Sequence, residues 1–307
     1  KINKMFWLFE KIYATIAPSK NRWRAAMDRH KRQWKAGALA LAAGAALCAG
    51  AVWALQGELG VTHYEIPLPE GLEGLDGLRI AQISDVHSAD IQKELQAALR
   101  EEPPDLIVFT GDLVNREDRD LSRAISLAAM AAQIAPAYYA PGNHEADSPC
   151  YPELREGLEK AGVTVLENEN AQLQRNGAQV NIIGLLDLAF HPQGRERARE
   201  ELPRLIQDLT LPGALNVALS HRPSLLEEYA AGGADLVFSG HAHGGQVRVP
   251  VVGPLFSTDE GIFPDHTAGV YPAGETWVVV SRGLGNGTPF PRLWNAPELV
   301  AVTLRAS

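Results

Sequence analysis

The chain has 307 residues, of which 46% are apolar, enough to bury the core of one large domain or two smaller ones. Its charge is uneven, because residues 1–35 hold ten Lys and Arg against two acidic residues, while the remainder holds 18 basic against 35 acidic. That acidic remainder argues against a nucleic-acid partner, since phosphate backbones are held mainly by Lys and Arg.

An uncharged stretch of twenty residues, 36–55, follows the basic segment and is about long enough to cross a bilayer as a helix. The preceding basic residues predict, by the positive-inside bias, that residues 1–35 are cytoplasmic and that everything after residue 55 is extracytoplasmic. We therefore expect a single-pass protein of the cell membrane, with 36–55 as its transmembrane anchor or uncleaved signal. Ala49-Gly50-Ala51 also fits a signal-peptidase site, so a cleaved export signal is an alternative reading.

Two further features of this part leave alternatives open. Residues 30–35 resemble a degenerate twin-arginine signal, with Lys31 in place of the first arginine. An apolar cluster between Met5 and Ile16 fits either an interfacial helix or a disordered cytoplasmic tail.

Residues 56–77 are expected to form a linker and a first strand region, and residues 78–307 a single domain. In that domain short apolar runs alternate with helical patterns, which predicts crossover connections and an α/β fold. The expected strands are 78–84, 105–110, 137–140, 180–186, 216–220 and 234–239, and the expected helices are 91–101, 120–134, 152–161, 195–209 and 223–231. Two later runs, 276–281 and 298–304, have no helix between them, so we expect them to pair as antiparallel strands.

Polar side chains follow five of the expected strands, at the point where each strand ends. Ligand sites in α/β sheets collect outside the carboxyl ends of strands, so these loops can converge on one place. The side chains are Asp85 and His87, Asp112, Asn143 with His144, His221, and His241 with His243.

These residue types indicate the kind of ion. Imidazole nitrogens mixed with carboxylate and amide oxygens, without thiolates, suit Mn, Fe, Zn or Co better than Mg or Ca. Seven donors are too many for one tetrahedral ion, whereas two ions bridged by a carboxylate account for them. Such a pair clamps the attacking and leaving oxygens of an in-line displacement, with a hydroxide between the ions as nucleophile.

The five blocks, read in order as DxH, GDxx, GNHE, an isolated His and GHxH, resemble the calcineurin-like metallophosphoesterases over about residues 78–305. The stretch GHAHGGQVRVPVVGP and the ending VVVSRGLGNGTPFPRLWNAPELVAVTLR are similar to the membrane-associated bacterial phosphodiesterase branch, the GHxHGGQ type. The resemblance implies a domain of two packed mixed β-sheets flanked by helices, preceded here by the one N-terminal transmembrane helix.

The resemblance also implies a role for each matching residue. Asp112 bridges the two ions, and His144 acts as general acid on the leaving group or stabilises transition-state charge. The first ion is then held by Asp85, His87 and His243, and the second by Asn143, His221 and His241. Asp187, after the strand at 180, is a weaker candidate for a supporting role.

The sequence departs from parts of the superfamily. Asn115 stands where many relatives have Asp, and the sequence is taken to lack the GDxxDRG arginine pattern of the protein phosphatases. A small or lipid-linked phosphoester is therefore the expected substrate.

The reaction we expect is hydrolysis of a phosphomonoester or phosphodiester at the outer membrane face. The alternative is a non-catalytic metal-binding scaffold of the same fold. GxSxG, Walker and Rossmann patterns are absent from the sequence, so other hydrolase or nucleotide-binding classes are not indicated. The sequence leaves open the natural substrate, the native metals, and the oligomeric state.

Overall fold

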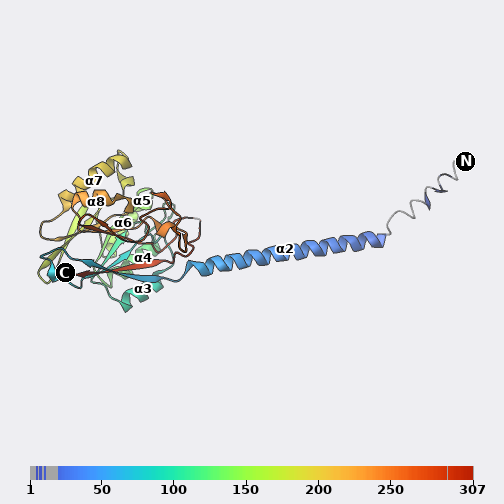
Figure 1. The fold of residues 1–307 in the computed structure, drawn as a ribbon, viewed down its shortest axis with the longest axis horizontal. Helices are drawn as coiled ribbons and strands as arrows, with labels where there is room; N and C mark the ends of the chain where they lie inside the picture. The colour runs from blue at the N-terminus through green and yellow to red at the C-terminus, as the bar shows by residue number, and fades with distance from the viewer. Residues whose placement is uncertain (1–4, 6, 9, 12–19, 289, 307) are drawn as a thin grey trace. The chain divides into compact units, whose positions relative to one another are not determined.

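The structure is a computed structural model, which describes residues 5, 7, 8, 10, 11, 20–288 and 290–306. It divides into two compact units, Lys1–Ala54 and Leu55–Ser307. The first is dominated by helix α2 (Lys20–Gln56), in which Met27–Ala51 is long and apolar enough to cross a membrane (Figure 1). The same length and composition also fit a signal sequence. The apolar cluster expected between residues 5 and 16 lies mostly outside the described residues.

The second unit is built on two six-stranded sheets, each with parallel and antiparallel neighbours. From one edge to the other, the first sheet contains the strands β1 (Gly60–Pro67), β16 (Glu298–Arg305), β2 (Arg79–Ile83), β3 (Leu106–Thr110), β4 (Ala137–Ala140) and β5 (Val163–Val165). The second contains β14 (Gly269–Ala273), β15 (Thr276–Val280), β9 (Leu236–Ser239), β8 (Leu215–Leu219), β7 (Ala178–Gly184) and β6 (Glu169–Arg175). The predicted pair of mixed sheets is confirmed.

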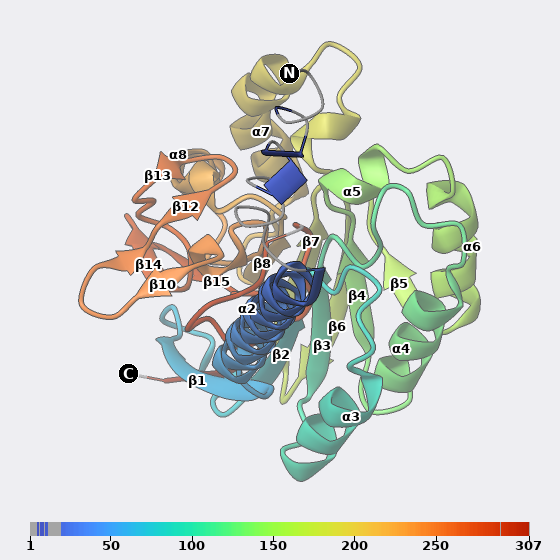
Figure 2. The same ribbon diagram turned by 90° about the vertical axis from the view of Figure 1, so that its right-hand side faces the viewer.

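Three layers of apolar packing hold the sheets and helices together. The facing sides of the two sheets form one core, in which Val108 of β3 and Phe238 of β9 are fully buried. A second core lies under the helices on the first sheet and a third under those on the second. The first group is α3 (Gln92–Glu101), α4 (Ser122–Ala132) and α6 (Tyr151–Lys160), and the other is α7 (Arg195–Leu209) and α8 (Leu226–Gly232), as Figure 2 shows.

Short elements connect these layers at the strand ends. Helix α5 (Asn143–Ala146) follows β4, and two small antiparallel hairpins follow β9. The hairpins consist of β10 (Arg248–Val249) with β11 (Gly253–Pro254), and β12 (Phe256–Ser257) with β13 (Gly261–Ile262). Single 3-10 turns are η1 (Glu73–Leu75), η2 (Leu188–Phe190), η3 (Pro223–Leu225) and η4 (His243–Gly245).

The expected pairing of 276–281 with 298–304 is wrong. Strand β15 lies in the second sheet, parallel to β9, whereas β16 lies in the first sheet between β1 and β2. Val278, Val279 and Val280 are fully buried, and their side chains point alternately to the two faces of β15. Both faces of the strand must therefore be covered by other elements, which an isolated pair of strands does not provide. Strand β1, in the region before residue 78, pairs along its whole length with β16.

Candidate metal centre

Five strand ends meet at one edge of the sandwich, as the pattern of polar residues predicts. Strands β2, β3 and β4 run parallel in the first sheet, and β8 and β9 run parallel in the second. The segments that follow them carry all eight predicted site residues. Seven of these residues are buried, and the eighth, His144, is partly exposed.

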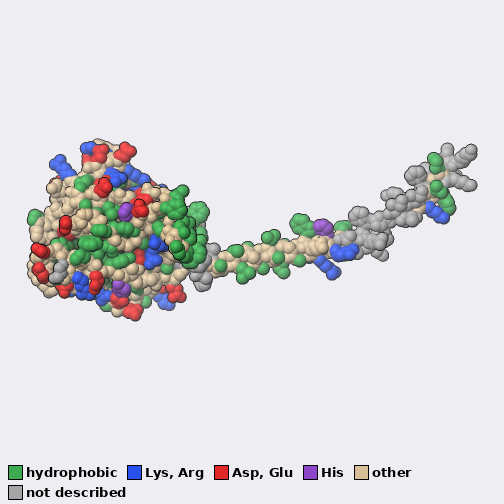
Figure 3. Space-filling model, viewed as in Figure 1, with side chains coloured by type: hydrophobic (Ala, Val, Ile, Leu, Met, Phe, Trp, Pro, Cys, Tyr) green, Lys and Arg blue, Asp and Glu red, His purple; other side chains and the backbone are tan. Residues whose placement is uncertain are grey.

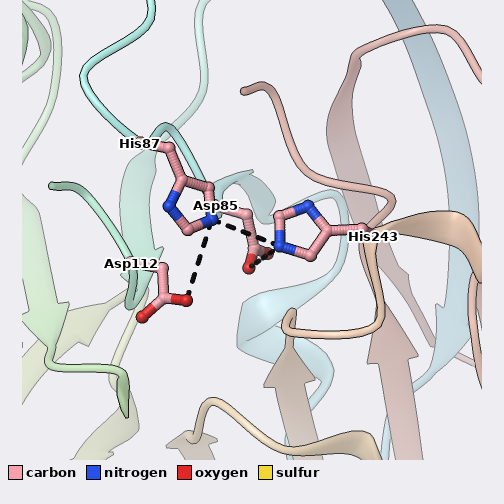
Figure 4. A group of neighbouring side chains, drawn as sticks. All are labelled: Asp85, His87, Asp112 and His243. Carbon is pink, nitrogen blue, oxygen red and sulfur yellow. Dashed lines mark hydrogen bonds and ion pairs between the residues drawn. The ribbon is translucent and has the colours of Figure 1, made fainter. Parts of the chain in front are cut away.

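The first group consists of Asp85, His87, Asp112 and His243, whose ligand atoms all lie within 4.8 Å of one another (Figure 4). The Nε2 atoms of His87 and His243 are 3.2 Å apart. His243 Nε2 is 3.5 Å from Asp85 Oδ1, and His87 Nε2 is 3.7 Å from Asp112 Oδ2. Two ring nitrogens that face each other beside carboxylates are arranged as donors to a common cation.

The second group consists of Asp112, His221 and His241. His221 Nε2 lies 3.2 Å from Asp112 Oδ2 and 3.1 Å from His241 Nδ1. The same oxygen, Oδ2 of Asp112, therefore faces a histidine of each group. A carboxylate in this position is placed to bridge two ions.

Asn143 adds an uncharged oxygen to the second group. It is the first residue of α5, and its buried Oδ1 has no hydrogen-bond partner among the described residues. A buried amide oxygen without a partner is costly unless an ion or water fills the gap. Gly142 lets the chain come this close, because a Cβ there would lie 2.4 Å from Asp112 Oδ1. Asn143 and the two groups thus fit a pair of divalent ions.

Backbone strain is concentrated at these residues. Asp85, His87, Asp112, His241 and His243 all have φ between 48° and 63°, the left-handed region that non-glycine residues seldom adopt. Such conformations persist where the surrounding structure enforces them, and they gather at functional sites. Here the strained turns aim five side chains at one point.

The acidic and histidine side chains of the centre shift one another's pKa values. Burial alone would raise the pKa of Asp112, but His221 and His87 hold it well below its usual range. Burial opposes a charge on His221, yet the Asp112 carboxylate raises its pKa to about 10. Burial lowers the pKa values of His87 and His243, so both rings are neutral donors at neutral pH.

His144 stands beside the first group rather than in it. Its Nε2 is 4.0 Å from Asp112 Oδ2, and its ring meets the His87 ring edge-on with centroids 4.7 Å apart. The backbone N–H of Arg116 donates to Nδ1, and Arg116 Nη2 lies 3.3 Å from Nε2. Burial is the main cause that lowers its pKa, and Asp112 opposes that shift. The Nε2 atom of His144 thus faces the Asp112 carboxylate, and the Arg116 guanidinium lies beside the ring.

Arg116 was missed in the sequence, although a signal was present. It follows Asn115 in GDLVNR, at the position that the arginine of GDxxDRG occupies, so only the second Asp and the final Gly of that pattern differ here. Its guanidinium donates to Asp147 at 2.9 Å and remains partly exposed. Asn115 also has a role, because its Oδ1 lies 3.1 Å from Nδ1 of His87 and leaves Nε2 to face the centre.

Glu145 holds two of the site loops together. Its buried carboxylate accepts hydrogen bonds from the backbone N–H groups of Asp112, Leu113, Val114 and Gly142, at 2.8 to 3.3 Å. It stands in the GNHE block, but nothing local in the sequence indicates that three of its four partners lie 31 to 33 residues earlier.

Asp259 and Arg222 form the outer support of the second group. Asp259 Oδ1 lies 3.2 Å from Nε2 of His241, which leaves Nδ1 of that ring toward His221. Arg222 donates to Asp259 at 2.6 Å and to Asp187 at 2.7 Å. Asp187, the weaker sequence candidate, therefore contacts the centre through Arg222. Asp259 gave no signal in the sequence, because it lies in the turn between β12 and β13.

The sequence model of the calcineurin-like phosphoesterase family matches residues 78–245. The chain is 30% identical to the uncharacterized metallophosphoesterase YkuE of Bacillus subtilis over 244 residues, 76% of this chain and 81% of that protein. It is 32% identical to the phosphodiesterase YaeI of Escherichia coli over 192 residues, 61% of this chain and 65% of that one. It is 28% identical to a transmembrane protein with a metallophosphoesterase domain from Danio rerio, over 80% of this chain and 57% of that protein.

Proposed function

Because the chain belongs to the calcineurin-like phosphoesterase family, we propose that it is a dinuclear metal-dependent hydrolase of phosphomonoesters or phosphodiesters. The observation that carries this proposal is the position of Asp112, whose Oδ2 faces His87 of one group and His221 of the other. The alternative, a non-catalytic scaffold, is not favoured, because every predicted position holds its expected residue and the structure brings these residues together.

Seven side chains would hold the ions. Asp112 is shared, and the donor set suits Mn, Fe, Zn or Co. When bound, the two ions supply an activated water and neutralise charge on the phosphoryl oxygens. The first ion is assigned to Asp85, His87 and His243, and the second to Asn143, His221 and His241.

His144 and Arg116 would act on the substrate. The His144 side chain is 13% exposed, whereas those of His87 and His221 are fully covered, so His144 can reach a bound ester. It gives a proton from Nε2 to the leaving oxygen as the ester bond breaks. The negative phosphoryl group raises the pKa of a histidine beside it, which offsets the effect of burial. The guanidinium of Arg116 contributes a positive charge on the same side.

A lipid-linked or envelope phosphoester at the outer membrane face is the proposed substrate. The support is the uncharged stretch 36–55, most of which lies in the membrane-crossing candidate of α2, preceded by seven Lys and Arg between residues 20 and 35. The acidic charge of the remainder favours small or lipid substrates over nucleic acid.

Two variants test the mechanism. His144→Ala should keep both metals and lose roughly 10²- to 10⁴-fold in turnover, the usual contribution of a general acid. Asp112→Ala should lose metal and activity together, because two cations then face each other without their common anion. His191→Ala is the matched control, since His191 pairs with Glu201 and belongs to neither metal-binding group.

The leaving group distinguishes a general acid from a merely structural histidine. A nitrophenyl ester departs without a proton, so the His144→Ala defect should shrink on that substrate and grow on an alkyl ester. Metal content and turnover are measured for each variant on both esters. Loss of a metal from His144→Ala, or a defect that is equal on both esters, contradicts the assignment.

A further inference from the structure

Exposed apolar side chains of the unit Leu55–Ser307 gather in two segments, 247–263 and 286–294. Among the described large apolar residues of this unit, Val61 is the one exposed side chain outside them. Figure 3 shows hydrophobic side chains of this unit over the middle of the visible face and at one edge. We call the exposed large apolar residues of the two segments the apolar rim, and its members are Val251, Val252, Phe256, Ile262, Phe263, Phe290 and Trp294.

Backbone contacts join the two segments that carry the rim. Val247 bridges to Leu293, and the N–H of Arg248 donates to the carbonyl of Leu293 at 3.0 Å, which joins the two segments. Within the first segment Leu255 donates to Val247 at 2.9 Å, and Phe263 donates to Leu255 at 3.0 Å. Backbone hydrogen bonds therefore fix both hairpins and the later loop as a unit.

The rim borders the metal centre on both sides. The hairpin that carries Phe256 and Ile262 also carries Asp259, whose carboxylate lies 3.2 Å from His241. The later loop passes so close to the other group that a Cβ at Gly287 would lie 2.6 Å from the His87 ring. A phosphoester bound at the centre would therefore lie beside the segments that carry the rim.

The charged residues of the two segments are engaged by the protein itself. Asp259 pairs with Arg222, and Glu260 pairs with His266 at 2.6 Å. Arg248 donates to Gly244 and Thr267. Arg292, the fourth charged residue, is buried and donates to the carbonyls of residues 282 and 285. The cost of removing water from unpaired charges is therefore small when the rim leaves water.

We propose that the apolar rim enters the interfacial layer of a lipid bilayer and presents the metal centre to phosphoester headgroups in that bilayer. Aromatic and aliphatic side chains on exposed turns suit this layer. The membrane-crossing candidate ends at Ala51, and β1 begins at Gly60, so the intervening chain spans at most about 30 Å. A bilayer that holds α2 is therefore within reach. This inference rests on the proposed phosphoesterase function and membrane attachment.

Contact with lipid can be measured without reference to catalysis. The full chain, with Cys48→Ala and Cys150→Ala, receives one cysteine at a time for an environment-sensitive fluorophore and is placed in vesicles of phosphatidylcholine and phosphatidylglycerol. Ile262→Cys reports on the rim, Val61→Cys is the matched exposed position outside it, and Leu41→Cys reports on α2. Quenching by brominated acyl chains is compared among the three.

The rim proposal expects a blue-shifted, strongly quenched label at position 262 and an unshifted, unquenched label at position 61. Equal quenching at the two positions would overturn it. A blue shift at 262 without quenching by brominated lipid would also overturn it, because a protein surface would then cover the rim. The label at position 41 separates the two membrane contacts. Quenching at position 41 but not at 262 would mean that α2 contacts lipid and the rim does not.

Turnover provides the second readout. The probes are hexadecyl nitrophenyl phosphate in vesicles and methyl nitrophenyl phosphate in solution. The double variant Val252→Ser with Ile262→Ser should lose about tenfold in kcat/KM on the hexadecyl ester, because two aliphatic side chains no longer enter the apolar phase, and should be unchanged on the methyl ester. Val61→Ser should match the wild type on both. An unchanged rate of the double variant on the hexadecyl ester contradicts the proposal that the rim enters the bilayer. If the wild type turns over neither ester, the phosphoesterase proposal is contradicted, and the fluorophore labels then test membrane contact of the rim by themselves.

Discussion

Glu145 provides a quantitative test of how the centre is held. Its carboxylate accepts four backbone N–H groups, with Oε1 taking those of Leu113 and Val114, and Oε2 those of Asp112 and Gly142. In Glu145→Ala all four donors lose their acceptor in a buried region. A buried donor without a partner costs about 1 to 3 kcal/mol, and water entering the space left by the side chain recovers part of that cost. We expect Glu145→Ala to lower the free energy of unfolding by about 4 kcal/mol.

Glu145→Gln divides the effect. The amide oxygen can still accept one pair of N–H groups, but its NH₂ group opposes the other pair, so about half of the loss is expected. The measurement is urea unfolding of metal-free protein in detergent, followed by tryptophan fluorescence. Glu275→Ala, in the exposed turn between β14 and β15, is the control and should change stability little. A loss below about 1 kcal/mol for Glu145→Ala, or equal losses for Ala and Gln, would refute the reasoning.

Two further predictions concern the second metal group and the topology. Asp259→Ala should weaken metal binding by about 10- to 100-fold, because the carboxylate no longer fixes the His241 ring with Nδ1 toward the ion. Competition with a chromophoric chelator measures the metal affinity. An unchanged affinity would contradict this role of Asp259. A reporter enzyme fused after Ser307 should be active only if it works outside the cytoplasm, and activity of a cytoplasm-dependent reporter would overturn the outward orientation.

The convergence of the eight predicted site residues can be read from the amino-acid sequence. Asp85, Asp112 and His221 each follow a short apolar run, and the ends of parallel strands lie along one edge of a sheet. Their convergence therefore depends on local pattern and on a general rule of α/β folds, both of which can be read before the fold is known. The five motif blocks added the family, and with it the expectation of two mixed sheets.

Contacts between segments far apart in the chain could not be predicted from the sequence. Glu145 reaches N–H groups 31 to 33 residues earlier, and Asp259 meets a histidine through a hairpin turn. The sheet partners of β15 and β16 could not be predicted either, because the pattern of apolar residues in a strand indicates which faces are buried but not which strand lies beside it. The two segments of the apolar rim likewise meet where residue 247 bridges to residue 293. Local periodicity specifies elements, whereas these contacts arise from how the folded layers close on one another.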